Sequence, residues 1–152
     1  MKNYVLIAAI MAHFVLVGAD IFAQVAITPV ALSAPPASLA MYQGEYVYDS
    51  ALFWRSTNMV ALVLLIAALA SNWRTSRRNL LLAWLSGSII VSILSLGYIF
   101  PEYTEIVSSV YSDTIDQELY QRGADWRVIA FVRWLVFAGI GVLPLIALSK
   151  RD

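Results

Sequence analysis

Three ionisable residues of this chain stand inside long apolar stretches, where charged side chains are uncommon. His13 and Asp20 occur in the first stretch, and Arg133 occurs in the last. A charge at the centre of a bilayer costs at least about 2.5–3.5 kcal/mol, so ionisable residues at such positions are candidates for function. An imidazole can act as a general base, and a carboxylate with a guanidinium can form the polar end of a site. We therefore predict His13, Asp20 and Arg133 as catalytic residues.

Asp20 and Arg133 are expected at similar depths. With a rise of about 1.5 Å per residue, they lie about 12 Å and about 10 Å inside the outer ends of their helices. We predict that they form a salt bridge, because pairing removes most of the cost of burying each charge. The pair is either a structural ion pair without a chemical role or the polar end of a site. His13 lies about 10 Å deeper, as a packing residue or at the floor of that site.

Further polar residues fall in the same outer half of the apolar stretches. Gln24 and Thr28 follow Asp20 at helical spacing, so these three residues share one helix face. The predicted ligand-binding residues are Gln24, Arg55, Asn58, Ser92, Ser95, Glu102 and Trp126. Together they predict a pocket that opens outwards and narrows inwards. Some also have an ordinary structural interpretation, because serines let membrane helices pack closely and an arginine can extend its charged head to the interface.

The chain offers little for metal or thiol chemistry. It has one histidine and no cysteine, which excludes disulfides, zinc–thiolate sites and multi-histidine metal sites. His13 and Asp20 are about 10.5 Å apart along a helix, too far to hold one ion. No metal site is predicted, no cofactor is identified, and none is expected. A formal net charge of zero leaves no basic surface that would indicate nucleic acid.

Long apolar runs must position these residues. Of the 152 residues, 61% are hydrophobic and 13% are charged, against about 45–50% and about 25% in soluble domains, which favours lipid as the solvent. Each run reaches the roughly 20 residues that a helix needs to cross a bilayer. The runs cover about residues 4–30, 51–70, 79–100 and 126–149. We predict an all-α fold in which residues 1–152 form one domain, an integral membrane four-helix bundle.

Basic residues predict how the bundle is oriented. If the chain crosses the membrane four times, the second loop and both termini lie on one side. The basic residues there are Lys2, Arg74, Arg77, Arg78, Lys150 and Arg151. By the positive-inside rule this side is cytoplasmic. We therefore predict an integral protein of the bacterial inner membrane with both termini in the cytoplasm.

The two outer loops are expected to carry structure of their own. Over about residues 103–120, apolar residues recur every three or four positions, which predicts an amphipathic helix in the third loop. This helix is either an interfacial anchor or a lid over a site. In the first outer loop, Tyr42, Tyr46 and Tyr48 suit a membrane interface or the mouth of a cavity.

Short motifs in three of the four predicted helices form a pattern. They are Gly18 to Pro29, Tyr98-Ile99-Phe100-Pro101, and Trp126 followed by Arg133. This pattern resembles the anthrone-oxygenase-like family of small four-helix membrane proteins. Where that family usually has two asparagines, this chain has Ala130 and Glu102. The resemblance implies a similar bundle and, as in some members, cofactor-free oxidation of an aromatic polyketide.

Three functions remain open from the sequence. The first is binding or oxidation of a small lipophilic or aromatic molecule in the polar pocket. The alternative is an accessory or assembly subunit of a membrane complex, whose polar faces contact partner helices. The third, a small oligomeric transporter or channel, ranks last because the inner half has few polar residues besides His13. The expected partners are the lipid bilayer and a small lipophilic ligand, further copies of the chain or a membrane partner subunit.

Overall fold

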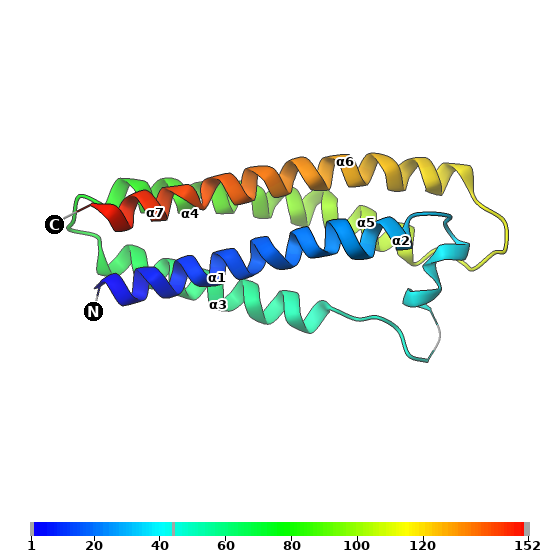
Figure 1. The fold of residues 1–152 in the computed structure, drawn as a ribbon, viewed down its shortest axis with the longest axis horizontal. Coiled ribbons are helices and arrows are strands. Elements are labelled where there is room, and N and C mark those ends of the chain that lie inside the picture. The colour runs from blue at the N-terminus through cyan, green and yellow to red at the C-terminus, as the bar shows by residue number, and fades with distance from the viewer. Residues whose placement is uncertain (1, 44, 151–152) are drawn as a thin grey trace.

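Four long helices run side by side in the computed structural model of this protein, which describes residues 2–43 and 45–150 (Figure 1). Two of the helices contain a π turn, and a 3₁₀ helix lies in the first outer loop. In chain order the elements are α1 (Lys2–Phe22), the π turn η1 (Ala23–Ile27), α2 (Thr28–Ala31), the 3₁₀ helix η2 (Ala37–Tyr42), α3 (Ala51–Ser71), α4 (Arg78–Leu94), the π turn η3 (Ser95–Ile99), α5 (Phe100–Val107), α6 (Gln117–Ile140) and α7 (Val142–Ser149). No strand occurs among the described residues.

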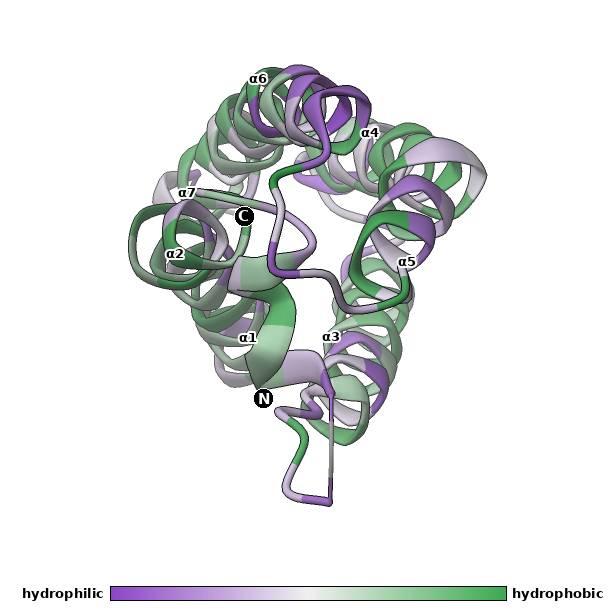
Figure 2. Ribbon diagram, turned by 90° about the vertical axis from the view of Figure 1, so that its right-hand side faces the viewer, coloured by the Kyte–Doolittle hydropathy of each residue, from purple (hydrophilic) through white to green (hydrophobic). Residues whose placement is uncertain are grey.

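All four helices are long and apolar enough to cross a membrane. The candidate spans are Asn3–Ala31, Ala51–Ser71, Arg78–Val107 and Gln117–Ser149. Large hydrophobic side chains are exposed along the helices. Figure 2, which views the bundle end-on, shows apolar residues on all of the long helices. A soluble monomer rarely exposes so much apolar surface. These features confirm the predicted all-α architecture with four long apolar helices, and they indicate a membrane protein.

The third and fourth helices extend well beyond their predicted ends. The third runs on past residue 100 to Val107, and the fourth begins at Gln117 rather than near residue 126. The prediction of a separate amphipathic helix over residues 103–120 is therefore wrong. Its two ends belong to α5 and α6, and residues 108–116 between them are not helical.

A capping residue interrupts the helical pattern in this third loop. Asp116 has an extended backbone, and its carboxylate accepts hydrogen bonds from the backbone N–H groups of Glu118 (2.9 Å) and Leu119 (3.1 Å). An aspartate in this position satisfies donors that the first helical turn leaves free, so α6 starts here. Val110, which the predicted apolar stripe included, is 88% exposed. The periodic spacing therefore did not correspond to one packed face.

Each π turn ends two residues before a proline. Ile27 at the end of η1 is followed by Pro29, and Ile99 at the end of η3 is followed by Pro101. A proline has no N–H to donate, and its ring clashes with the preceding turn, so the regular hydrogen bonds cannot continue through it. Both prolines are accommodated in the first turn of the next helical segment, α2 or α5. Pro101, expected to close the third helix, therefore lies inside it.

Two hydrophobic clusters fill the bundle, one towards each end. The first includes Leu6, Leu81 and Trp84, and the second includes Leu32, Ile106 and Trp126. Helix α1 packs mainly against α3, whereas α4 packs against α7 and α6. Because the two clusters involve different parts of the same long helices, the packing at one end is distinct from the packing at the other.

Arg77 ties together the end of the bundle at which α1 begins and α7 ends (Figure 1). Its guanidinium donates hydrogen bonds to the Asn3 side-chain oxygen and to the Lys150 backbone carbonyl, each at 2.6 Å. The second loop therefore lies beside both ends of the described chain, as four crossings require. Arg151, one of the basic residues used to predict orientation, lies outside the described residues.

His13 is buried among aromatic rings where α1 passes the junction of α6 and α7. Its side chain is 3% exposed, and its ring centroid lies 4.4 Å from that of Phe137 and 5.6 Å from that of Trp84. Within the described residues its Nε2 atom has no hydrogen-bond partner. A Cβ atom on Gly141 would lie 2.6 Å from Nε2, so the glycine is what lets the imidazole fit.

We expect Gly141→Ala to lower the free energy of unfolding by about 1–3 kcal/mol, because the new methyl group would overlap the His13 ring. Gly139→Ala is the matched control, since a Cβ atom at residue 139 meets nothing within 4 Å. The control should be neutral or slightly stabilising, because alanine favours helix over glycine. Unfolding by increasing dodecyl sulfate in mixed micelles, followed by circular dichroism, measures both. Equal stability of the two variants would contradict the close packing of His13.

Candidate functional site

An ion pair joins the first and fourth helices inside the bundle. The Arg133 guanidinium donates a hydrogen bond to the Asp20 carboxylate, and the two side chains are 12% and 10% exposed. The salt bridge predicted from their depths is therefore confirmed. The Arg133 Nε atom is buried and has no hydrogen-bond partner among the described residues. The pair thus retains one donor that the described protein groups leave unused.

Both π turns contact the helix that carries Arg133. The turns η1 and η3 each pack against α6, so the regular helical pattern is interrupted on two helices that face the same neighbour. Gln24, in η1, is buried four residues beyond Asp20, on the same face of the first helix. One residue beyond Arg133, the Trp134 indole N–H donates to the Val17 carbonyl at 3.0 Å. Because π turns are frequent at functional sites, this region is a candidate site.

A chain of aromatic residues connects the other end of α6 to the first outer loop. The Trp126 indole N–H donates to the Ile99 carbonyl at 2.8 Å, and the indole stacks on Tyr103 with 4.6 Å between centroids. The hydroxyl groups of Tyr103 and Tyr42 are hydrogen-bonded at 2.5 Å, and the Tyr42 ring lies 6.0 Å from that of Tyr48. The loop that carries Tyr42 and Tyr48 is therefore held against the third and fourth helices.

Tyr42 lies outside the candidate membrane spans, and its surroundings keep its hydroxyl protonated. Burial raises the pKa of Tyr42, and the hydrogen bond with Tyr103 offsets part of that rise. A neutral phenol can donate one hydrogen bond and accept others. The contact between the two tyrosines is therefore present over the whole physiological pH range, and it fixes the loop without introducing a charge.

Glu102, predicted to bind ligand, is paired within the protein. Its carboxylate accepts a hydrogen bond from the Arg122 Nε atom at 2.8 Å, and the same guanidinium donates to Glu105 at 2.7 Å. Arg122 was not singled out from the sequence. Glu102 and Glu105 are three residues apart and share a helix face, but their partner could be found only once the start of the fourth helix was known.

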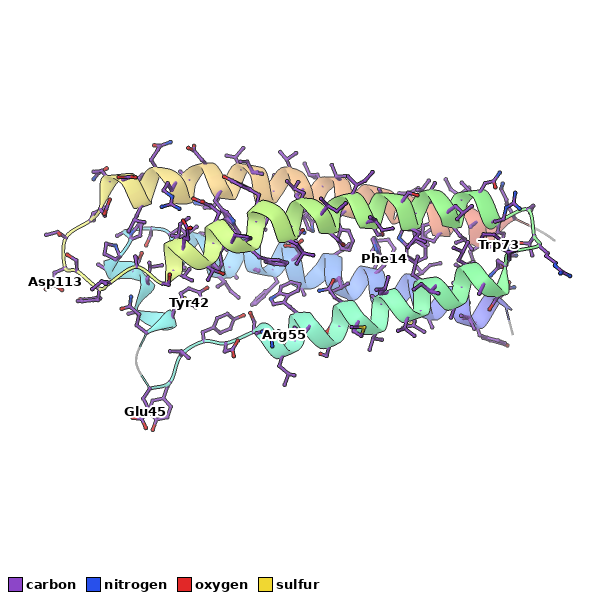
Figure 3. The ribbon with its side chains drawn as sticks, turned by 180° about the vertical axis from the view of Figure 1, so that it is seen from behind. Phe14, Tyr42, Glu45, Arg55, Trp73 and Asp113 are labelled. Carbon is purple, nitrogen blue, oxygen red and sulfur yellow. The ribbon has the colours of Figure 1, made fainter. Side chains whose placement is uncertain are left out.

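Of the remaining predicted ligand-binding residues, three are exposed and the fourth, which is buried, is bonded to its own helix. Arg55, Asn58 and Ser92 are exposed on the bundle, and Figure 3 shows Arg55 near the start of α3. The Asn58 side chain donates to the Trp54 carbonyl at 2.8 Å. Ser95 is buried and donates to the Val91 carbonyl at 2.8 Å. In both contacts a short polar side chain bonds to a carbonyl of its own helix, which is an ordinary structural role in membrane helices.

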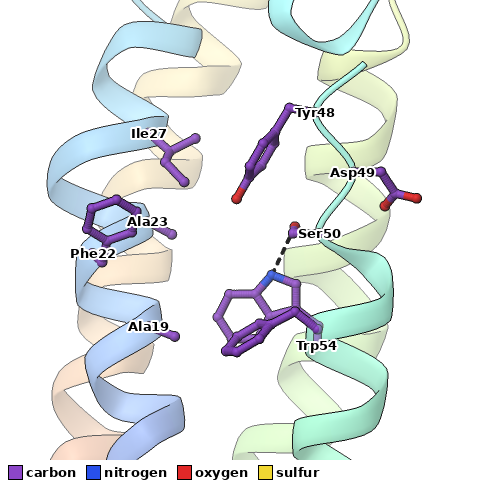
Figure 4. Close-up of a pocket in the computed structure, with 9 residues that line it drawn as sticks. Ala19, Phe22, Ala23, Ile27, Tyr48, Asp49, Ser50 and Trp54 are labelled. Carbon is purple, nitrogen blue, oxygen red and sulfur yellow. Dashed lines mark hydrogen bonds between the residues drawn. The ribbon is translucent and has the colours of Figure 1, made fainter. Parts of the chain in front are cut away.

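A cleft of about 340 Å³ opens between α1 and the start of α3 (Figure 4). It occupies the region where these two helices separate (Figure 1). It is lined by Ala19, Phe22, Ala23, Ile27, Tyr48, Asp49, Ser50, Phe53 and Trp54. None of the predicted ligand-binding residues is among them, although the tyrosines of the first outer loop were expected at an interface or at the mouth of a cavity. Of these tyrosines, Tyr48 lines the cleft.

The cleft and the ion pair lie on adjacent faces of the first helix. Ala19 and Ala23 line the cleft, whereas Asp20 and Gln24, each one residue further on, are buried inside the bundle. Successive residues of a helix differ by about 100°, so the two stripes are neighbours around the helix axis. The small alanine side chains leave space on one face, and the ion pair holds the next face against α6.

The described residues contain no group of three or more histidine, cysteine, aspartate or glutamate side chains that could hold a metal ion. The chain matches no protein-family model, no curated protein and no solved structure. The family resemblance suggested by its motifs therefore stays a prediction. The basis for a proposed function is therefore the geometry of the site, which consists of a largely apolar cleft beside a buried ion pair.

We expect Asp20→Asn and Arg133→Gln each to lower the free energy of unfolding by about 3 kcal/mol, because either change leaves the other charge buried without its counterion. The loss of stability in the double variant should be clearly smaller than the sum of the two single losses, since the double variant leaves no unpaired charge. Arg127→Gln, which removes an exposed arginine from the same helix, should leave stability nearly unchanged. Unfolding by dodecyl sulfate in mixed micelles measures the stability of all four variants. Strictly additive losses would contradict a direct ion pair.

Proposed function

We propose that this protein is a bacterial inner-membrane protein that binds a small lipophilic molecule in the cleft between α1 and α3. The proposed orientation follows from charge. Arg74 and Arg77 lie in the second loop and Arg78 begins α4, at the end of the bundle with Trp73, while Glu45 and Asp113 lie at the other end (Figure 3). The positive-inside rule then assigns the arginine-rich end, with both termini, to the cytoplasm. The cleft belongs to the opposite, outer half.

The observation that carries this proposal is the size and lining of the cleft. Small-molecule sites occupy about 300–1,000 Å³ and are mostly apolar with a few polar groups, and the cleft fits both criteria. Phe22 and Phe53 on its walls are partly exposed on the surface that would face lipid. A molecule dissolved in the bilayer could therefore enter sideways between the helices, without passing through water.

Oxidation of the bound molecule is the reaction that the family resemblance would add. In that version His13, Asp20 and Arg133 are the proposed catalytic residues. Asp20 lies on the face of α1 next to the cleft, whereas His13 is two helical turns away and packed against Gly141. None of these three residues lines the cleft, so the geometry supports binding of a molecule there more directly than it supports a reaction.

A second candidate function is that of an accessory subunit in a membrane complex. Helix α3 packs mainly against α1 and leaves large hydrophobic residues exposed along most of its length, among them Leu52, Met59 and Val63. An unpartnered helix face of this kind suits contact with another membrane helix as well as contact with lipid. Co-purification of a stoichiometric partner in mild detergent would favour this function, and a single monodisperse species would count against it.

Ala23→Trp should abolish binding, because an indole on this wall would fill the cleft. Ala26→Trp is the matched control: it places the same side chain in the same π turn, at an exposed position that does not line the cleft. Mass spectrometry of organic extracts from the purified proteins measures what each retains. We expect a small molecule with the wild type and with Ala26→Trp, and its loss with Ala23→Trp. Equal retention by all three would contradict the assignment of the cleft.

A further inference from the structure

Few polar residues line the cleft, and some of their side chains already make hydrogen bonds within the protein. Trp54 offers an indole N–H, but this group already donates to the Ser50 hydroxyl oxygen at 3.1 Å (Figure 4). The Asp49 carboxylate accepts a hydrogen bond from the Ala51 backbone N–H at 2.7 Å, at the start of α3. Both contacts serve the protein itself. They build one wall of the cleft and fix its rim.

The Tyr48 hydroxyl differs from these groups. Figure 4 shows the ring reaching from the extended segment before α3, with its oxygen directed into the space between the two helices. The hydroxyl makes no hydrogen bond with another described residue. The Tyr48 backbone N–H, in contrast, donates to the Met41 carbonyl at 2.8 Å, and its ring packs edge-on against Tyr42. The donor is therefore held in place before any molecule binds.

We infer that Tyr48 determines specificity: its hydroxyl donates a hydrogen bond to an uncharged acceptor, such as a ketone carbonyl, at the outer end of the bound molecule. This inference rests on the proposed function of the cleft. The acceptor is uncharged because the cleft lining contains no basic side chain, so a bound anion would lose its hydration without gaining a counterion. The remainder of the molecule is apolar, because alanine, isoleucine and aromatic side chains form the other walls.

The position of Tyr48 favours this role energetically. A donor that is already oriented spends less conformational entropy when it meets its acceptor than a mobile one does. In an apolar cleft, an acceptor that finds no donor loses its hydrogen bonds to water without replacement. A molecule that carries a carbonyl at the correct end is therefore bound more tightly than one of the same shape without it, and the difference depends on one oxygen atom of the protein.

Two probes of nearly equal shape test the inference: 2-acetylnaphthalene, which has a ketone, and 2-ethylnaphthalene, which does not. Their dissociation constants are measured by quenching of tryptophan fluorescence, with the whole protein in detergent micelles. We expect wild type to bind the ketone about fivefold more tightly, as one net hydrogen bond allows. Tyr48→Phe should bind 2-ethylnaphthalene as wild type does, and it should bind 2-acetylnaphthalene no more tightly than that hydrocarbon, because the ketone then finds no donor. Tyr46→Phe, which changes a 92% exposed tyrosine of the same loop, should behave as wild type.

The possible outcomes separate the inference from the function on which it rests. Unchanged binding of 2-ethylnaphthalene by Tyr48→Phe shows that this variant is folded and that its cleft is open. Equal affinity of wild type for the two probes, or a preference for the ketone that survives in Tyr48→Phe, would overturn the role of Tyr48 alone. If Ala23→Trp binds both probes as wild type does, or if wild type binds neither, the cleft is not a binding site. Either result would also overturn the role of Tyr48.

Discussion

The ion pair between Asp20 and Arg133 is the interaction on which the arrangement of this bundle depends. It joins residues 113 positions apart in the chain and holds the first helix against the fourth. In an apolar interior neither charge is tolerable alone, so the pair restricts the two helices to registers in which the charges meet. Once that face of α1 is turned towards α6, the adjacent stripe with Ala19 and Ala23 faces α3. That rotation places the small side chains of Ala19 and Ala23 on the wall of the cleft.

The prolines and π turns impose a second constraint on how the helices pack. A proline inside a membrane helix leaves carbonyl groups without their usual donors, and lipid supplies no replacement. In the first helix, the Thr28 hydroxyl donates at 3.3 Å to the Gln24 carbonyl, which lies five residues before Pro29. Near Pro101 in the third helix, the Ile99 carbonyl accepts a hydrogen bond from the Trp126 indole of the fourth helix. Side-chain hydrogen bonds thus stabilise both helices near their prolines. This explains how two helices can be irregular beside a buried charge pair and still pack against α6.

Hydropathy and helical geometry were sufficient to predict some features and not others. Four long apolar runs predict four helices, and counting residues along two of them predicts that Asp20 meets Arg133. The side of a helix that faces lipid is set by packing between helices, so the exposure of Arg55, Asn58 and Ser92 could not be read from spacing. The true start of the fourth helix depended on capping by Asp116. The cleft depended on how α1 and α3 diverge, which no local pattern encodes.

In the proposed arrangement, the bundle crosses the membrane four times and the cleft lies in its outer half. Because the chain has no cysteine, single-cysteine variants report topology without background labelling. Ser108→Cys lies at the end of α5 and Ser76→Cys in the second loop, and both serines are exposed. A membrane-impermeant maleimide applied to intact spheroplasts should label Ser108→Cys, and should label Ser76→Cys only after the membrane is opened. Labelling of both in intact spheroplasts, or of Ser76→Cys alone, would contradict the account.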